Sequence, residues 1–298
     1  MKPLTAEDAS SSFASVTRDY LELSKSRIVL MVLMTTAAGF LVASFGNPDM
    51  VLLLHTLIGT AFVAAGTNAL NQYVERDLDA MMHRTRTRPL PEGRITPQAA
   101  LGYAVAIVVA GSLYLAVTVN MLTSLLGLAT MASYLFAYTP LKRTTTLSTI
   151  VGAVPGAIPP LMGWSAARGS VEYGGWLLFA ILFLWQLPHF LAIGWLYRDD
   201  YARAGYAILS VKDSEGRVSG RQAILYTLAL IPISLFPSFF GLAGKGYLPG
   251  ALAAGLFLLV ASVAFAKSRT MKGARNLFVA SIVYLPVIML LLVASSSR

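Results

Sequence analysis

Nine apolar runs, each about 18–22 residues long, restrict the fold of this chain more than any other feature of its sequence. A run of this length crosses a bilayer as an α-helix, and a segment that crosses lipid must satisfy its backbone hydrogen bonds internally. The sequence therefore predicts an all-α, polytopic membrane protein with nine transmembrane helices. The runs cover approximately residues 28–46, 51–71, 99–118, 121–138, 149–168, 174–195, 222–240, 248–267 and 276–295.

The distribution of charge predicts the orientation of these helices. With the N-terminus in the cytoplasm, 20 of the 23 Lys and Arg residues fall on the cytoplasmic side. Cytoplasmic loops are enriched in these residues, so we expect a protein of the cell (inner) membrane with a cytoplasmic N-terminus and an external C-terminus. Topology therefore explains the net charge of +9 without a nucleic acid partner. The same side also holds 12 of the 14 acids, which topology does not require and which a metal-dependent site would explain.

Composition limits the class of protein further. Only 12% of the residues are charged, against about 25% in soluble domains. Because the first 20 residues are polar, we expect no cleaved signal peptide. We expect residues 1–24 to form a cytoplasmic tail and residues 25–298 to form a single transmembrane domain. The sequence contains no Cys, which excludes disulfides and thiolate metal sites.

A polar segment follows the second apolar run. If this segment continues the helix, Asn71, Glu75 and Asp79 fall within an arc of about 80°. Asn68 lies in the same arc, and Asp77 points away from it. Like charges on one helix face are unfavourable unless a cation lies between them, and Mg²⁺ prefers carboxylates, waters and substrate phosphates. We predict a Mg²⁺ site on this face; the alternative is a solvated cytoplasmic loop whose arginines serve topology.

Basic residues near this face suit a diphosphate. Arg84 and Arg88 follow the acids, and a guanidinium presents a fork of donors to phosphate oxygens. Lys142 and Arg143 follow the fourth apolar run, and we predict the same role for them. Tyr138 lies just before this pair, either as a further substrate contact or as one of the aromatic residues common at membrane edges.

A second polar cluster lies at the end of the sixth run. His189 and Asp200 are eleven residues apart, which places them close to one face if the helix is continuous. An ionisable residue within a span is costly and is by default a candidate functional residue. We predict that the pair Asp199-Asp200 places a second Mg²⁺ opposite the first and that His189 has a functional role. The alternative for His189 is a buried side chain that is hydrogen-bonded to a neighbouring helix, and the sequence leaves open whether Asp77 or Asp199 contacts metal.

Several motifs occur in a combination that is typical of one known family. Asn71, Glu75 and Asp79 form the first motif, and Asp200 belongs to a second acidic motif. Together with the run Trp-Gln-Leu-Pro-His-Phe, which contains His189, they resemble the UbiA-type intramembrane prenyltransferases, and most closely the branch that farnesylates protoheme IX. The other similar stretches are Arg84-Thr85, Arg88-Pro89-Leu90-Pro91, Leu141-Lys142-Arg143 and Gly156-Ala157-Ile158-Pro159-Pro160.

This resemblance implies a fold, a reaction and a set of site residues. The nine helices would surround a central cavity that opens toward the cytoplasm. The enzyme would use Mg²⁺ to transfer the farnesyl group of farnesyl diphosphate to a vinyl group of heme b, giving heme O. Its partners would be these substrates, the bilayer and possible downstream proteins, namely heme A synthase or oxidase assembly factors. Catalytic and metal-binding roles are implied for Asn71, Glu75, Asp79 and Asp200, and substrate contacts for Asn68, Arg84, Arg88, Tyr138, Lys142, Arg143 and His189.

The sequence departs from the family pattern at four positions. Ser26 replaces the usual Pro, and Ser148 replaces the usual Asn. Ala207 and Ser210 lie where prolines are usual. We expect altered loop geometry and one altered polar contact, with both acidic motifs intact.

Two other functions are compatible with the residues. One is a prenyltransferase with an aromatic or quinone-precursor acceptor. The other is a membrane transporter, because polar residues in kinked spans also mark ion paths. The acids lie mainly at the inner ends of the spans, and this position favours an enzyme.

Overall fold

The structure is a computed structural model that describes residues 6–296, with side chains from residue 15 onward. Within this range every regular element is a helix, and nine helical segments are long and apolar enough to cross a membrane, as predicted. The elements are α1 (Ala6–Leu23), α2 (Ser26–Ala43), α3 (Met50–Met81), α4 (Pro97–Thr118), α5 (Met121–Ala132), a π-helix η1 (Ser133–Tyr138), α6 (Thr139–Leu141), α7 (Ser148–Arg168), α8 (Tyr173–Leu196), α9 (Arg198–Arg203), α10 (Leu209–Lys212), α11 (Arg217–Phe239), α12 (Tyr247–Ser268) and α13 (Met271–Ser295).

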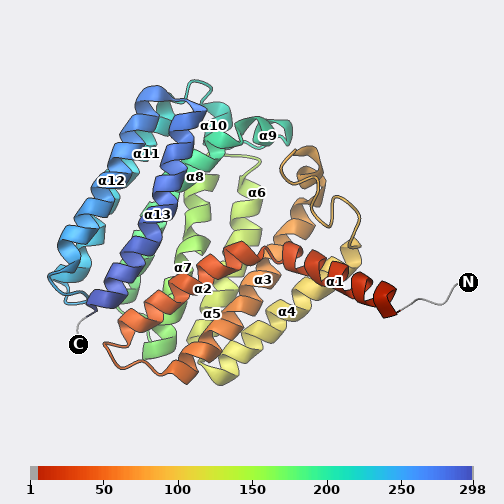
Figure 1. Ribbon diagram of the computed structural model, residues 1–298, viewed down its shortest axis with the longest axis horizontal. Coiled ribbons are helices and arrows are strands. Elements are labelled where there is room, and N and C mark those ends of the chain that lie inside the picture. The colour runs from red at the N-terminus through yellow and green to blue at the C-terminus, as the bar shows by residue number, and fades with distance from the viewer. Residues whose placement is uncertain (1–5, 297–298) are drawn as a thin grey trace, which may run out of the picture.

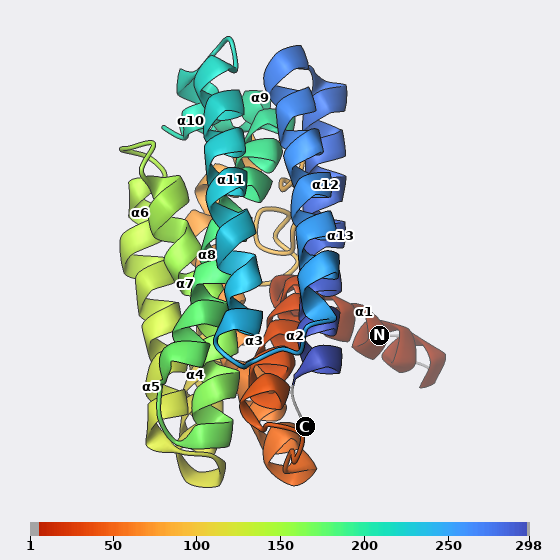
Figure 2. The same cartoon turned by 90° about the vertical axis from the view of Figure 1, so that its left-hand side faces the viewer.

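The helices form a bundle with α7 and α8 in its middle. Figure 1 shows α11, α12 and α13 on one side of this pair and α3, α4 and α5 on the other. Figure 2 shows the long helices running roughly parallel to one another, with α9 and α10 at one end of the bundle. The hydrophobic segment of α7 is 72% buried, the largest fraction among the spans, so α7 is the centre of the packing.

Small residues allow this central position of α7. A Cβ atom at Gly163 would collide with the backbone of Thr36 in α2, and one at Gly156 would collide with the side chain of Gln186 in α8. Small residues let membrane helices approach closely. The three prolines of α7 are buried within this packed helix, which fits a packing role for the segment.

The outer surface of the bundle is apolar. Large side chains such as Leu30, Val117 and Leu290 are exposed there. Exposed apolar side chains in this number are expected where lipid takes the place of water. The protein is therefore a multi-pass membrane protein.

The sixth span differs from its prediction at one point. α8 ends at Leu196, and α9 begins at Arg198 after a break at Tyr197. The predicted continuous stripe that joins His189 to Asp200 is wrong, because these residues lie on two separate helices. The acids of the following segment lie in the first turn of α9, where negative charge is favourable, and this favours a new helix start. The predicted central cavity stays a prediction.

Candidate active site

The predicted polar face of α3 is buried. Asn68, Asn71, Glu75 and Asp79 are 7, 1, 5 and 1% exposed, whereas the side chain of Asp77 is 84% exposed. The helical spacing therefore predicted correctly which residues share a face and which residue points away. A row of buried amides and carboxylates needs partners, and other elements supply them.

Packing against α4 positions α3. Asp49 caps the start of α3 by accepting hydrogen bonds from the backbone N–H groups of Val51 and Leu52. Further along, Gly66 brings the helix so close to α4 that a Cβ atom there would lie 2.5 Å from a methyl carbon of Val108. The helix continues past its apolar part to Met81, so the polar face is carried on a rigid element.

Glu75 is surrounded by donors from three parts of the chain. The Nζ atom of Lys142 lies 2.8 Å from its Oε1 atom, and the hydroxyl of Tyr206 donates to the same oxygen at 3.0 Å. The amide of Asn71 donates to Oε2 at 2.9 Å. Burial alone would lower the pKa of Lys142, but the Glu75 carboxylate outweighs burial and raises it, so the ammonium stays charged.

Tyr206 is a site residue that the sequence analysis missed. It lies in the segment between α9 and α10, far from Glu75 in the sequence, and no local pattern indicates their contact. Burial and the neighbouring Glu75 carboxylate raise the pKa of Tyr206. Its hydroxyl therefore keeps its proton and remains a donor.

Lys25 is a second site residue that was missed. It lies at the break between α1 and α2 with a left-handed backbone (φ 52°), and its Nζ atom donates to Oδ1 of Asn71 at 2.9 Å. Burial, and then repulsion by Arg88, lowers the pKa of Lys25 to about 7. In the sequence this lysine resembles a topological charge at the start of a span. The contact therefore appears only in the fold.

The segment after α3 folds back on Asp79. The Nη1 atom of Arg88 lies 2.6 Å from Oδ2 of Asp79, and the hydroxyl of Thr85 donates to the Asp79 carbonyl at 2.8 Å. The carboxylate is almost fully buried, whereas the Arg88 side chain is 21% exposed. The Arg88 side chain is therefore partly accessible from outside the protein.

Asp200 joins the second acidic cluster to this same segment. Its two carboxylate oxygens accept hydrogen bonds from the backbone N–H groups of His83 and Arg84, each at 3.2 Å. The Arg203 guanidinium donates a third hydrogen bond to the same carboxylate at 2.6 Å. Burial alone would raise the pKa of Asp200, but these donors outweigh burial and lower it. Asp199 in contrast has a 91% exposed side chain.

No group of three or more His, Asp or Glu side chains placed to hold a metal occurs in the described range.

The remaining predicted residues divide between the site and its surroundings. Arg84 lies over the ring of Tyr197, with 4.6 Å between the guanidinium carbon and the ring centroid. Tyr138 lies under Lys142, with 4.5 Å from Nζ to its ring centroid. Asn68 donates to a backbone carbonyl of the α1–α2 turn, and Arg143 is exposed. His189 lies elsewhere, against α13.

Comparisons with known proteins agree with this fold. The UbiA prenyltransferase family matches residues 32–284. A protoheme IX farnesyltransferase of Solibacter usitatus is 48% identical over 283 residues, covering 91% of this chain and 96% of the relative. Another protoheme IX farnesyltransferase, of Salinibacter ruber, is 42% identical over 274 residues, covering 92% of this chain and 97% of the relative.

Solved structures share the fold at low sequence identity. A digeranylgeranylglyceryl phosphate synthase superposes with a TM-score of 0.78 at 16% identity, over 94% of this chain and 98% of its own. A UbiA homologue of Archaeoglobus fulgidus, solved with GPP and Mg²⁺, gives a TM-score of 0.67 at 15% identity, over 92% of this chain and 99% of its own. The family match extends from α2 into α13 and includes the buried acids of α3, and this membrane protein therefore belongs to the UbiA prenyltransferase family.

Proposed function

We propose that this prenyltransferase transfers the farnesyl group of farnesyl diphosphate to a vinyl group of protoheme IX (heme b) and so forms heme O. The observation that carries the proposal is the similarity, at 42–48% identity over most of both chains, to curated protoheme IX farnesyltransferases. The buried acids of α3 and the cations around them support the same reaction class.

The oxygens on the α3 face have the chemistry that Mg²⁺ selects. Mg²⁺ is commonly bound by one or two carboxylates together with substrate phosphates, and here two buried carboxylates and one amide oxygen share a face. Each of these groups now contacts a basic side chain: Asn71 contacts Lys25, Glu75 contacts Lys142, and Asp79 contacts Arg88. Positive charge thus already lies beside both carboxylates. Asn71, Glu75 and Asp79 would hold one Mg²⁺, which supplies Lewis-acid stabilisation of a diphosphate leaving group.

Asp200 is the proposed ligand of a second Mg²⁺. A carboxylate offers about four acceptor positions, and two backbone N–H groups and Arg203 use three of them. One position remains for a metal. Because Asp200 fixes the segment that carries Arg84 and Arg88, it also positions the cations of the site.

The basic residues would bind the diphosphate once metal replaces them on the acids. Lys142 and Arg88 lie beside Glu75 and Asp79, so each has a phosphate position within reach. Arg84 would bind a phosphate too, and we propose contacts for Arg143, Tyr138 and Asn68 at the same end. When the farnesyl C–O bond ionises, negative charge develops on the diphosphate, and preorganised cations stabilise that charge.

His189 is the proposed contact for heme. The Ser281 hydroxyl donates its hydrogen bond to the carbonyl of Phe278 at 2.6 Å, so its oxygen accepts a hydrogen bond from the Nδ1–H group of His189 at 2.8 Å. The Nε2 atom then keeps a free lone pair, the form that binds iron. Trp185 and Phe278 both stack on the imidazole, with ring centroids 5.1 Å apart in each pair. These contacts fix the ring.

We propose the following sequence of bond changes. Farnesyl diphosphate loses diphosphate, and the terminal vinyl carbon of heme b captures the allylic cation. Water then adds to the new cation next to the porphyrin ring and gives one proton to the departed diphosphate. An apolar intramembrane chamber would keep other water away from the first cation.

The place of the protein in the cell is also a proposal. The charge asymmetry supports the cell (inner) membrane, with a cytoplasmic tail at residues 1–24, a transmembrane domain at 25–298 and an external C-terminus. Heme A synthase or oxidase assembly factors are the proposed recipients of the product.

A direct assay tests the proposed function. Purified protein is incubated with labelled farnesyl diphosphate, Mg²⁺ and either heme b or a panel of aromatic acids, and pigments are extracted anaerobically. Farnesylated heme is the expected product. Product from an aromatic acid, and none from heme b, would assign a different acceptor. Solute flux in proteoliposomes without diphosphate release would instead indicate a transporter.

A further inference from the structure

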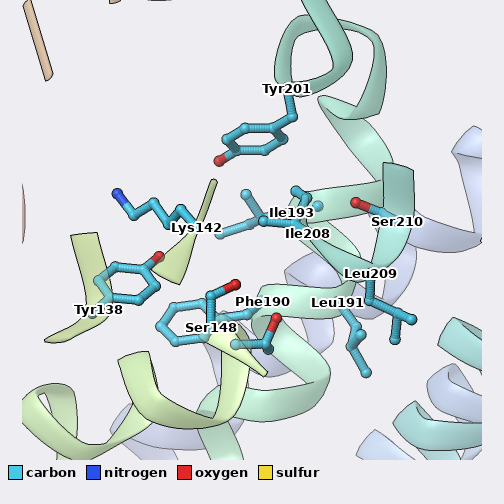
Figure 3. A pocket seen from close by; sticks show the side chains of 12 residues that line it. Tyr138, Lys142, Ser148, Phe190, Leu191, Ile193, Tyr201, Ile208, Leu209 and Ser210 are labelled. Atoms are coloured by element: carbon cyan, nitrogen blue, oxygen red, sulfur yellow. The ribbon is translucent and has the colours of Figure 1, made fainter. Parts of the chain in front are cut away.

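Two buried serine hydroxyls without a partner line one small pocket beside the site. Ser148 is 0% and Ser210 is 4% exposed, and in the described part of the chain neither hydroxyl oxygen has a hydrogen-bond partner. The pocket that contains them, here called the hydroxyl pocket, is lined by residues of η1, α7, α8 and the segment from α9 to α10, and by Lys142 directly after α6. Figure 3 shows both hydroxyls directed toward its middle from two sides.

The chain leaves space for these hydroxyls. A Cβ atom at Gly194 would lie 2.8 Å from the Ser210 oxygen, so a glycine at this position keeps room beside the hydroxyl. Burying a hydroxyl without a hydrogen bond is costly. Two such groups that face one pocket therefore indicate that the pocket holds a polar occupant.

The size and lining of the hydroxyl pocket select water as this occupant. Its cavity volume is about 70 Å³, whereas pockets for drug-sized ligands have about 300–1,000 Å³. One water needs only about 10–15 Å³ and two to four polar partners. Tyr138, Thr149 and Tyr201 also line the pocket, and each carries a hydroxyl group. Neither a farnesyl chain nor a porphyrin fits in this space.

The hydroxyl pocket adjoins the diphosphate end of the site. Lys142 and Tyr138 line the pocket, and the Nζ atom of Lys142 lies 2.8 Å from Glu75. In Figure 3 the amine of Lys142 extends away from the pocket while its stem forms part of the wall. In the proposed reaction, the carbon that must be hydrated is two bonds from the carbon that loses diphosphate. A stored water has to lie close to the diphosphate site, and the hydroxyl pocket has this position.

We propose that the hydroxyl pocket stores the water molecule that hydrates the porphyrin-bound cation after farnesyl transfer. This inference rests on the proposed function. The oxygen of the water forms a C–O bond with the cationic carbon next to the ring, and the water loses one proton to the departing diphosphate. Without a water in place, the same cation loses a proton from the adjacent CH₂ group and forms an alkene. That product is lighter by one water molecule.

The test measures the ratio of these two products. The variants are Ser148→Ala, Ser210→Ala and the double variant, assayed with heme b, farnesyl diphosphate and Mg²⁺, with products separated by mass spectrometry. Ser219→Ala is the matched control, because its hydroxyl is equally buried and unpartnered but lies on α11, outside the hydroxyl pocket. Binding of heme b, followed by its absorption spectrum, checks that each variant is folded.

We expect the ratio of hydrated to dehydrated product to fall roughly tenfold in the double variant, the effect of losing hydrogen bonds to the attacking water. Each single variant should show a smaller change, and Ser219→Ala should show none. An unchanged ratio in the double variant would overturn the proposal. So would a folded double variant that forms no farnesylated porphyrin, because the serines would then act in an earlier step. Absence of farnesylated heme with the unsubstituted protein would instead overturn the proposed function.

Discussion

The buried pair of Lys142 and Glu75 gives the sharpest quantitative prediction. Their side chains are 11 and 7% exposed, and the Nζ and Oε1 atoms are 2.8 Å apart. Removing one partner of a buried ion pair costs about 3–5 kcal/mol, because the other charge stays behind. In Lys142→Met, Glu75 would keep its hydrogen bonds from Asn71 and Tyr206. We therefore expect a loss of about 3 kcal/mol in the free energy of unfolding, at the lower end of that range.

A double-mutant cycle isolates the interaction. Lys142→Met, Glu75→Gln and the double variant are unfolded in mixed micelles, and we expect a coupling energy of about 2 kcal/mol. The control cycle uses Arg217→Met and Glu215→Gln, whose side chains are also close, at 2.6 Å, but 74 and 62% exposed. Exposed pairs of this kind contribute under about 1 kcal/mol.

Ligand addition relates this coupling to the proposed function. If Glu75 holds Mg²⁺ and Lys142 turns to a phosphate, an excess of Mg²⁺ with an unreactive farnesyl diphosphate analogue should reduce the coupling between them. A coupling below about 0.5 kcal/mol without ligand, the limit of additivity for independent sites, would refute the argument from burial. A coupling energy of about 2 kcal/mol that stays the same when ligand is added would refute the proposal that Glu75 moves to Mg²⁺ and Lys142 to a phosphate.

Three further outcomes are expected. Asp79→Ala should abolish diphosphate release but keep a monodisperse inserted protein in size-exclusion chromatography, and normal turnover would contradict the metal assignment. Removal of divalent cations by EDTA should stop turnover reversibly. His189→Ala should raise the heme b concentration required far more than that of farnesyl diphosphate, and equal increases would count against a heme contact.

The lowered pKa of Asp200 predicts how pH affects the segment after α3. A group whose pKa is lowered on folding stabilises the folded form above its unfolded pKa of about 3.9, and this stabilisation is lost as pH falls through the folded value. Limited proteolysis of the segment around Arg84 should therefore accelerate in acid. Asp200→Asn should show fast cleavage at neutral pH as well. Cleavage of the unsubstituted protein that does not respond to acid would contradict the anchoring role.

The spans and the α3 face were predictable because their signals are local. Hydropathy over a window of bilayer length gave nine spans, and helical spacing alone separated buried Asp79 from exposed Asp77. Lys25 and Tyr206 could not be predicted, because each contacts α3 only through long-range folding. The stripe from His189 to Asp200 was wrong because angular spacing has meaning only within one unbroken helix.

The π-helix η1 has a consequence for how the site depends on the chain. A π-helix closes its turns over five residues instead of four, and η1 precedes Lys142 by only a few residues. Deleting one residue from Ser133–Tyr138 and returning to ordinary pitch would therefore leave everything beyond it facing nearly the same way, whereas deleting one residue from α5 with η1 kept would turn everything beyond it by about 100°. In the second case Lys142 would face away from Glu75 although both side chains were kept. The alignment of the two charges thus depends on the pitch of this stretch together with its number of residues, and η1 is the place where a one-residue deletion should do least damage.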